Sequence, residues 1–217
     1  MTPIIHRYGG TVDKFIGDAV MAFWGAPLAD PRHAEHAVRA AIDMQVAMQA
    51  LAERLTGRGL PSIAMRIGVH TGRVVVGNIG SLSRFSYTVI GDAVNLAARL
   101  EGANKAFGSG VLVSDATAAL LPADIRLRLL DRVIVKGKSE SIAVYTPCTD
   151  TDLITGSSTA VESFYTQQWD ASEAAFRSVL LAKPDDTSAK RFLDRIAALR
   201  QKPAGSAVSE PLSLDKL

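Results

Sequence analysis

The 217-residue sequence contains one cysteine, Cys148. A single cysteine excludes an internal disulfide and any metal site built from a cysteine cluster, which fits a reducing compartment. No apolar run approaches the roughly 18–20 residues of a membrane-spanning helix, and the N-terminal MTPIIHRYGG has too short an apolar stretch for a secretory signal. We therefore expect a cytoplasmic chain without a membrane segment, or one held at the cytoplasmic face of a membrane if a longer parent chain carries a sensor domain.

An excess of charge of one sign is also missing. The 24 Lys and Arg residues nearly balance the 22 Asp and Glu residues, which leaves a net charge of +2. This balance gives no attraction toward nucleic acid, so we expect no nucleic-acid partner. The hydrophobic content of 47% and the charged content of 21% are typical of a soluble globular protein. The length suits one domain of ordinary size with an appendage.

Glycines, prolines and polar residues divide the first two thirds of the chain into short elements. Alternating apolar residues predict strands, and apolar residues three and four apart predict helices. The expected elements are a hairpin at 8–25 that turns at Gly17-Asp18, a long helix from Asp30 to Gly57, strands at 63–69 and 74–76, a turn at 77–80, a strand at 87–90, a helix at 92–105, a strand at 111–113, a helix at 115–121 and a hairpin at 127–145. Tight turns between neighbouring strands favour an α+β fold, a sheet with helices on its faces.

The rest of the chain has a different composition. Residues 1–147 form the main predicted domain, and the small polar residues at 148–160 predict a linker. Residues 161–200 have two helical patterns, broken near Pro184, which predict one tetratricopeptide-like helical hairpin. A single unit of this kind cannot bury its own faces, so we expect it to pack on the main domain or to bind a protein partner. Residues 201–217 are expected to be loosely ordered.

Two charged residues interrupt the apolar segment VDKFIGDAVMAFWG at 12–25, namely Lys14 and Asp18. A charge that is buried alone is very costly, so each residue needs water, a partner or a ligand. The predicted turn VKGKSE at 135–140 carries two further lysines, Lys136 and Lys138. Such a turn is either simply solvated or places a lysine near a phosphate.

A second segment, YTVIGDAVNLAARLE at 87–101, combines an amide and a guanidinium. Asn95 and Arg99 lie four residues apart on the predicted helix, so both project from one face near its start. Free backbone amides and the helix dipole attract anions there, and the two side chains would suit a sugar and a phosphate. The alternative is that Arg99 forms a surface pair with Glu101 or Asp92.

In order and spacing, the blocks KFIGDAVMAF, GVHTGRVVVGNIG, VIGDAVNLAARLE and VKGK resemble the catalytic domain of class III adenylyl and guanylyl cyclases, over about residues 4–146. The sequence is more narrowly similar to bacterial single-domain adenylate cyclases. The resemblance implies a ferredoxin-like cyclase sheet and a signalling lyase that converts ATP to 3′,5′-cyclic AMP and pyrophosphate. It also implies two Mg²⁺ or Mn²⁺ ions and a head-to-tail homodimer with sites between the subunits.

The resemblance assigns purine recognition to two positions. Lys14 matches the lysine that reads the purine, and Thr88 stands where many family members have its aspartate partner. Adenine N1 accepts a hydrogen bond from an ammonium, whereas guanine N1 carries a hydrogen and would meet Lys14 donor against donor. A wrong base left unpaired costs about 1–3 kcal/mol, so ATP is favoured over GTP. Because Thr88 can donate as well as accept, the discrimination is looser than with an aspartate.

The resemblance also assigns residues that contact the sugar, the phosphates and the metal. Asn95 matches the asparagine that orients the ribose, and Arg99 matches the arginine that stabilises the transition state. Asp18 matches the second of two metal-binding aspartates. Lys136 matches the phosphate-binding lysine, with Lys138 as the rival.

The resemblance also predicts what is missing. In the family, another metal-binding aspartate lies on a strand that precedes the Asp18 block, and the segment from Met1 matches the end of the helix that follows this strand. By strand alternation Asp13 should point to the face opposite Lys14, and Asp30 is better explained as a helix cap, so neither replaces the lost ligand. We therefore expect impaired catalysis and a marginal or self-associating chain, explained by a truncated reading frame or a fragment.

The sequence suggests two other functions. A catalytically silent module that binds nucleotide, or that serves in dimerisation, would use the same base, ribose and phosphate residues. A diguanylate cyclase is suggested by GGTVDKFIGD, beside the GGDEF pattern. That reading fails because the acidic pair is absent, and because the helix with Asn95 and Arg99 has no counterpart in that scheme.

Overall fold

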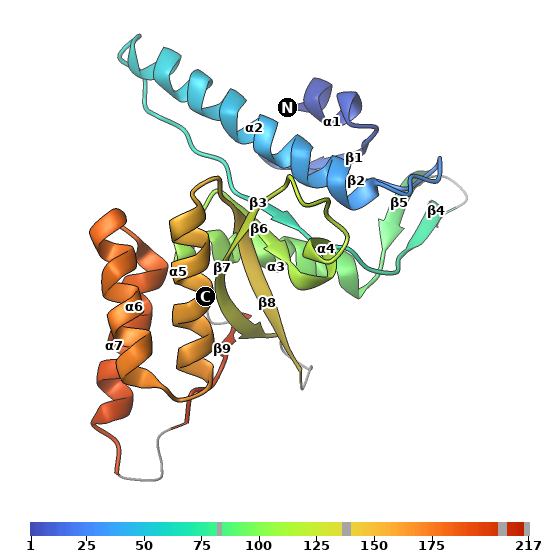
Figure 1. The fold of residues 1–217 in the computed structure, drawn as a ribbon. Helices are drawn as coiled ribbons and strands as arrows, with labels where there is room; N and C mark the ends of the chain where they lie inside the picture. Colours follow the sequence, from blue (N-terminus) through green and yellow to red (C-terminus); the bar gives the residue numbers. More distant parts are fainter. Residues whose placement is uncertain (82–83, 136–139, 204–207, 215–217) are drawn as a thin grey trace.

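The computed structural model describes residues 1–81, 84–135, 140–203 and 208–214, and Figure 1 labels its elements. The first half of the chain forms α1 (Thr2–Arg7), β1 (Thr11–Ile16), β2 (Ala19–Phe23), α2 (His33–Thr56), β3 (Ile67–Val69), β4 (Val75–Ser81), β5 (Arg84–Ile90) and α3 (Asp92–Phe107). The second half forms β6 (Val111–Ser114), α4 (Asp115–Ala118), β7 (Leu127–Ile134), β8 (Ser141–Pro147), α5 (Thr151–Tyr165), α6 (Trp169–Ala182), α7 (Thr187–Arg200) and β9 (Leu212–Ser213). Among the helices of these ranges, none has the length and hydropathy of a membrane span.

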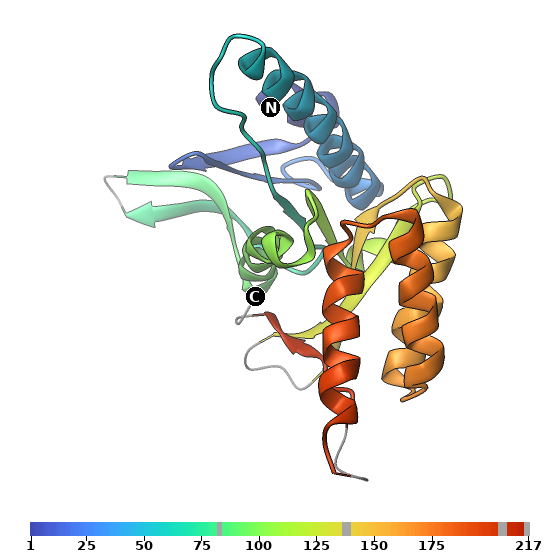
Figure 2. The ribbon, with the colours of Figure 1, turned by 90° about the vertical axis from the view of Figure 1, so that its left-hand side faces the viewer.

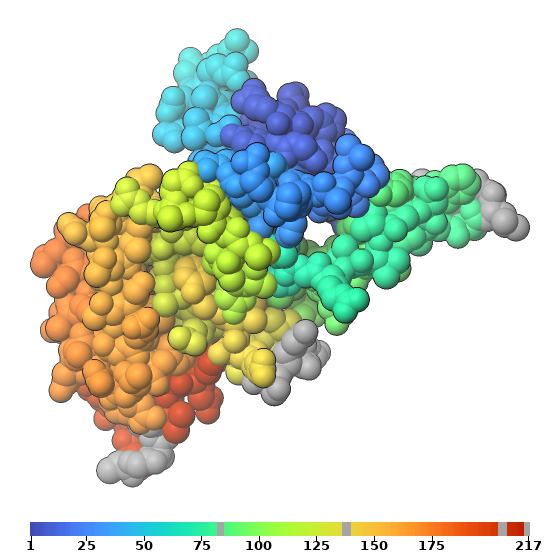
Figure 3. Space-filling model, turned by 45° about the vertical axis from the view of Figure 1, so that its right-hand side comes forward, coloured from blue at the N-terminus to red at the C-terminus, as the bar shows by residue number. Residues whose placement is uncertain are grey.

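The strands of the described ranges form a five-stranded sheet and two separate hairpins. The sheet has the order β3–β6–β8–β7–β9, with β6–β8 and β7–β8 antiparallel and β3–β6 parallel. The hairpins are β1–β2 and β4–β5. In Figure 3 the β4–β5 hairpin projects from the body of the molecule as an arm. The mixture of antiparallel hairpins and helices on the sheet confirms the predicted α+β class.

Helices cover both faces of the five-stranded sheet. Successive residues of a strand point to opposite faces, and on β6 Leu112 packs with Leu100 of α3, whereas Val113 packs with Val38 of α2. On the same face of the sheet as α2, Leu129 of β7 packs in the core formed by α5, α6 and α7. Figure 2 shows the sheet between α3 and the α5–α7 group. The position of α3 is therefore set by a core of its own on one face of the sheet.

Gly68 brings α3 directly against β3. A Cβ atom at Gly68 would lie 2.1 Å from the carbonyl oxygen of Ala97 and 2.4 Å from the amide nitrogen of Glu101, both in the helix backbone. Backbone atoms cannot rotate away as a side chain can, so this contact requires glycine. Gly68 thereby allows the short distance between β3 and α3, the helix that carries Asn95 and Arg99.

We expect Gly68→Ala to lower the free energy of unfolding by about 1–3 kcal/mol or more, because the added methyl group forces α3 away from the sheet. The matched control is Gly77→Ala on β4, where a Cβ would meet no atom within 4 Å. Urea denaturation of both variants measures the difference. Equal stability of the two variants would contradict the close approach of α3 to β3.

The three C-terminal helices α5, α6 and α7, called the helical tail below, pack on the five-stranded sheet through two buried ion pairs. Arg128 of β7 and Asp186, which precedes α7, are paired at 2.5 Å, and each side chain is 4% exposed. Asp131 of β7, with a fully buried side chain, is paired with Arg195 of α7 at 2.9 Å and accepts a hydrogen bond from Tyr165 Oη at 2.7 Å. Burial raises the pKa of the Asp131 carboxyl, while Arg195 acts in the opposite direction. These pairs, together with the apolar core, join the helices to the strand.

Several segments differ from the sequence-based expectation. The C-terminal helical region consists of α5, α6 and α7 rather than two helices, because residues 166–168 interrupt the predicted first helix. Helix α5 begins at Thr151, inside the stretch expected to be a linker, and it buries Ser157, Val161 and Phe164. Strand β9 lies in the tail expected to be loosely ordered, and it pairs parallel to β7. The turn predicted at 77–80 is wrong, because β4 continues through these residues to Ser81 in register with β5.

Candidate functional site

The β1–β2 hairpin carries the first group of predicted site residues. Its turn contains Gly17, whose φ of 63° favours glycine, followed by Asp18. Asp18 is exposed at the tip of this turn, whereas Lys14 lies farther along β1, opposite Met21. The turn therefore presents the carboxylate at one end of the hairpin, and the strand presents the ammonium nearer the body of the domain.

Asp13 connects the two hairpins. Its side chain is fully buried, and its Oδ2 accepts a hydrogen bond from Thr88 Oγ1 of β5 at 2.5 Å. The Nζ atom of the neighbouring Lys14 lies 3.5 Å from Asp13 Oδ1, and the Lys14 side chain is 46% exposed. Thr88 is 6% exposed. Lys14 and Thr88, both predicted to read the purine, thus meet around one buried carboxylate.

This cluster corrects the expectation that Asp13 points away from Lys14. Strand alternation assumes regular pairing, but the register of β1 and β2 shifts between Val12 and Lys14. Such a shift marks a β-bulge, which redirects the side chain of the extra residue. Asp13 therefore turns toward β5 while Lys14 stays beside it. The sequence offered no signal for this bulge.

The β5 strand leads from Thr88 to the predicted anion-binding helix. Phe23 of β2 and Tyr87 of β5 are 6.1 Å apart between ring centroids, a second contact between the hairpins. Gly91, with φ of 152°, then turns the chain into α3, which begins at Asp92. Thr88 and the first turn of α3 are therefore joined by three residues.

On α3 the predicted ribose and phosphate residues share one face. Asn95 is exposed and Arg99 is half-buried, four positions farther along the helix. Glu101, one of the two acidic residues in the alternative pairing of Arg99, accepts a hydrogen bond from Arg66 Nε at 2.9 Å. Among the described residues, the structure brings Lys14 and Thr88 together and places Asn95 and Arg99 on the helix that follows. Lys136 and Lys138 lie outside the described residues.

The described carboxylate, histidine and cysteine side chains decide whether this chain can hold a pair of metal ions. Within residues 1–81, 84–135, 140–203 and 208–214, no group of three His, Cys, Asp or Glu side chains is arranged to hold a metal ion. Asp13 is directed at Thr88, so Asp18 remains the carboxylate at the turn. One carboxylate with waters and phosphates holds Mg²⁺ only weakly. The described donors of one chain therefore do not form a two-ion site.

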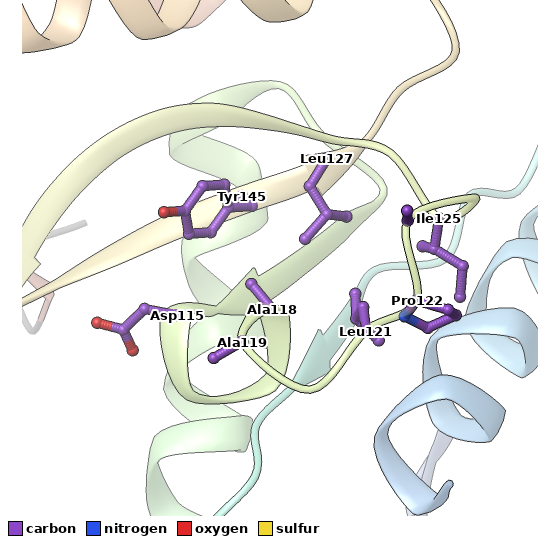
Figure 4. Close-up of a pocket in the computed structure, with 9 residues that line it drawn as sticks. Asp115, Ala118, Ala119, Leu121, Pro122, Ile125, Leu127 and Tyr145 are labelled. Carbon is purple, nitrogen blue, oxygen red and sulfur yellow. The ribbon is translucent and has the colours of Figure 1, made fainter.

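A separate pocket lies between α4, the loop that follows it and β8 (Figure 4). Its lining includes Leu121 and Ile125, with Asp115 and Tyr145 toward one end. Asp115 Oδ2 accepts a hydrogen bond from the backbone amide of Ala143 at 3.2 Å. As far as the chain is described, this lining contains no basic side chain. The pocket therefore does not suit a triphosphate.

Comparison with known proteins adds an independent observation. Residues 3–146 match the family model described as the adenylate and guanylate cyclase catalytic domain. The chain is 42% identical over 142 residues to adenylate cyclase 1 of Rhizobium meliloti, covering 65% of this chain and 21% of that protein. It is 43% identical over 152 residues to an adenylate cyclase of Anabaena cylindrica, covering 67% of this chain and 29% of that protein. The chain thus spans less than a third of the length of these curated relatives.

A solved structure agrees with the sequence comparisons. The adenylyl cyclase CyaB from P. aeruginosa superposes with a TM-score of 0.62 at 37% sequence identity. The match covers 69% of this chain and 76% of that chain. The matched region, residues 3–146, contains the two hairpins and α3, and it ends before α5.

Proposed function

The chain belongs to the adenylate and guanylate cyclase catalytic domain family, and from this premise we propose that it binds ATP and forms 3′,5′-cyclic AMP and pyrophosphate. The observation that carries the proposal is the meeting of Lys14 and Thr88 around Asp13, on two hairpins that are far apart in the sequence. The adenylate cyclases of Rhizobium meliloti and Anabaena cylindrica support the choice of ATP.

In this proposal Lys14 and Thr88 read the edge of adenine. The Lys14 ammonium donates to N1, and the Thr88 hydroxyl accepts from the 6-amino group. Guanine would present a hydrogen at N1 and an acceptor at position 6, so it would match neither group. Polar groups left unpaired when the base binds cost about 1–3 kcal/mol, which corresponds to roughly 5- to 150-fold selectivity.

The helix α3 supplies the groups for the ribose and the α-phosphate. Asn95 would hold the ribose so that its 3′-oxygen faces the α-phosphorus. The 3′-oxygen forms a bond to this phosphorus, the bond to the bridging oxygen breaks, pyrophosphate leaves, and the 3′-hydroxyl proton passes to water. Arg99 would stabilise the charge that develops on the α-phosphate oxygens, which is the main contribution of the protein in phosphoryl transfer. Lys136, or its rival Lys138, would bind the other phosphates.

Divalent ions, Mg²⁺ or Mn²⁺, would neutralise the triphosphate when bound. Asp18 is the described residue that we assign to them, and no chemical step is derived through the ions, because the described donors do not complete a two-ion site. This shortage favours a second candidate function, a catalytically silent module that binds ATP without turnover.

We further propose that the site is completed by a second copy of the chain in a two-fold homodimer. The family resemblance implies that the metal carboxylate and the base-reading lysine of one site come from different copies, and Asp18 is exposed at the hairpin tip, where a second copy could reach it. Both hairpins carry large exposed apolar side chains, Phe15, Ile16, Val75, Phe85 and Ile90. An apolar surface of this kind on a projecting arm (Figure 3) is typical of a protein interface.

The experiment is incubation of the purified chain with ATP and Mn²⁺, with cyclic AMP measured by chromatography. We expect cyclic AMP to form and Asp18→Asn to abolish its formation, because the neutral amide binds a divalent ion far more weakly. Asp185→Asn, an exposed carboxylate in the helical tail, is the matched control. If ATP binds without turnover and Lys14→Ala weakens this binding, the silent module is the function. If ATP does not bind at all, both candidates are wrong.

A further inference from the structure

Asp13 is a buried carboxylate between the two residues that we propose to read the base. Its side chain is fully buried, and one oxygen, Oδ1, receives no hydrogen bond within the described part of the chain. The Lys14 ammonium lies 3.5 Å from this oxygen as an ion pair, yet a buried polar atom that lacks a hydrogen bond still carries a cost of up to about 1–3 kcal/mol, which calls for an explanation other than stability. The bulge in β1 is a second sign, because bulges often redirect a side chain at a functional site.

The hydrogen bond to Thr88 restricts what this threonine can do. A threonine hydroxyl has one proton to donate and two lone pairs to accept with. In the structure the proton of Thr88 Oγ1 is donated to Asp13 Oδ2 at 2.5 Å. While this bond is held, the hydroxyl has only lone pairs to offer to another group. Asp13 thereby converts an ambiguous hydroxyl into an acceptor.

We propose that Asp13 is a specificity-determining positioning residue, which makes Thr88 an acceptor and holds the Lys14 ammonium beside it, so that the pair selects adenine. This inference rests on the proposed function and deepens it. Lys14 Nζ lies 3.5 Å from Asp13 Oδ1, so the same carboxylate attracts the donor while it orients the acceptor. One donor beside one acceptor complements N1 and the 6-amino group of adenine. The same pair opposes the N1 hydrogen and the 6-oxygen of guanine.

The proposal predicts the effect of an isosteric change. In Asp13→Asn the amide can donate to Thr88, which frees the hydroxyl proton for the 6-oxygen of guanine. The probes are the α,β-methylene analogues of ATP and GTP with Mg²⁺, which cannot be cleaved at the bond that cyclisation breaks. Titration calorimetry gives both dissociation constants. We expect the wild-type preference for the ATP analogue to fall by about tenfold in Asp13→Asn.

A double-mutant cycle separates this role from a structural one. Thr88→Val removes the hydroxyl and should lower the preference in the wild-type background, but it should change little in the Asp13→Asn background. A loss of fold alone would not make the two changes depend on each other. Asp43→Asn is the matched control, since Asp43 accepts a hydrogen bond from Tyr8, the residue that follows α1, away from this cluster, and should leave the preference unchanged.

If Asp13→Asn does not fold, a second measurement on the wild-type chain tests whether Thr88 acts as an acceptor. The wild-type chain is titrated with purine riboside triphosphate and with its 6-methoxy derivative, in which N1 remains an acceptor and position 6 carries an acceptor oxygen. We expect the 6-methoxy compound to bind about tenfold more weakly, and equal binding would overturn the proposal. An unchanged preference in Asp13→Asn, together with a reduced one in Thr88→Val, would overturn this proposal and leave the proposed function standing. No binding of either triphosphate analogue by the wild-type chain would overturn both.

Discussion

Replacement of Arg99 by alanine is expected to lower the rate of cyclic AMP formation by about 100- to 1,000-fold. Arg99 lies on the face of α3 that also carries Asn95, one turn farther along the helix. Its guanidinium would meet the negative charge that grows on the α-phosphate oxygens as the 3′-oxygen attacks. An interaction that strengthens in the transition state affects turnover more than it affects binding of the substrate.

The control for Arg99→Ala is Arg66→Ala. Arg66 is another arginine that contacts α3, because its side chain donates a hydrogen bond to Glu101. Both side chains of this pair are exposed. Exposed pairs contribute about 0–1 kcal/mol, so Arg66→Ala should leave the rate nearly unchanged. Single-turnover rates and ATP dissociation constants are measured for both variants. A rate in Arg99→Ala equal to that of Arg66→Ala would remove Arg99 from the proposed mechanism.

Replacement of Asp186 by alanine should destabilise the protein by about 3–5 kcal/mol, because it leaves Arg128 as a buried charge without its partner. For a chain of this size the loss corresponds to a fall in Tm of roughly 6–20 °C. Asp186 also caps α7, since its Oδ1 accepts a hydrogen bond from the amide of Ala189 at 2.8 Å. Arg128 makes a further hydrogen bond to Ser157 Oγ of α5 at 2.6 Å. One aspartate therefore joins β7 to the tail helices.

The pH dependence of this effect follows from the Asp186 carboxyl. Burial raises its pKa, but the hydrogen bonds from Arg128 and from the Ala189 amide outweigh burial, so the pKa lies below the ordinary value. A depressed pKa in the folded state adds stability above the unfolded value of about 3.9, and this stability is lost as the pH falls through the folded value. The gap between wild type and Asp186→Ala should therefore shrink below about pH 4.

Thermal unfolding of Asp186→Ala and of Asp185→Ala across pH 3–7 tests both statements. Asp185 precedes Asp186 in the sequence but is exposed, so its replacement should change Tm by a degree or two at most. A Tm of Asp186→Ala equal to that of Asp185→Ala at pH 7 would show that the buried pair does not hold the tail to the sheet.

Local patterns predicted much of the fold, whereas the roles of the candidate site residues came from the family resemblance and stay a prediction. Glycine and aspartate at 17–18 predicted the turn of the first hairpin, because glycine readily adopts the positive φ found there. The 3.6-residue periodicity at 92–105 predicted α3, and with it the shared face of Asn95 and Arg99. Both signals come from residues that are close together in the sequence, so they can be recognised without knowledge of the tertiary contacts.

Other segments gained their structure from distant partners. Residues 151–160 are small and polar, as in a linker, but they form the first part of α5 because Ser157, Ala160 and Val161 are buried in the assembled fold. The glycines at 77 and 80 suggested a turn, yet strand β4 continues through them because β5 supplies hydrogen-bonding partners in register. Propensity is a weak signal when burial and pairing oppose it.

By itself, the sequence determined which residue types are available for a nucleotide: an ammonium at Lys14, a hydroxyl at Thr88, and an amide and a guanidinium on one helical face. The tertiary structure alone decided that Lys14 and Thr88 both contact Asp13. A bulge turns Asp13 inward to Thr88, across 75 residues of sequence. Strand alternation could not reveal this contact, because a bulge forms only where the pairing of two strands is interrupted.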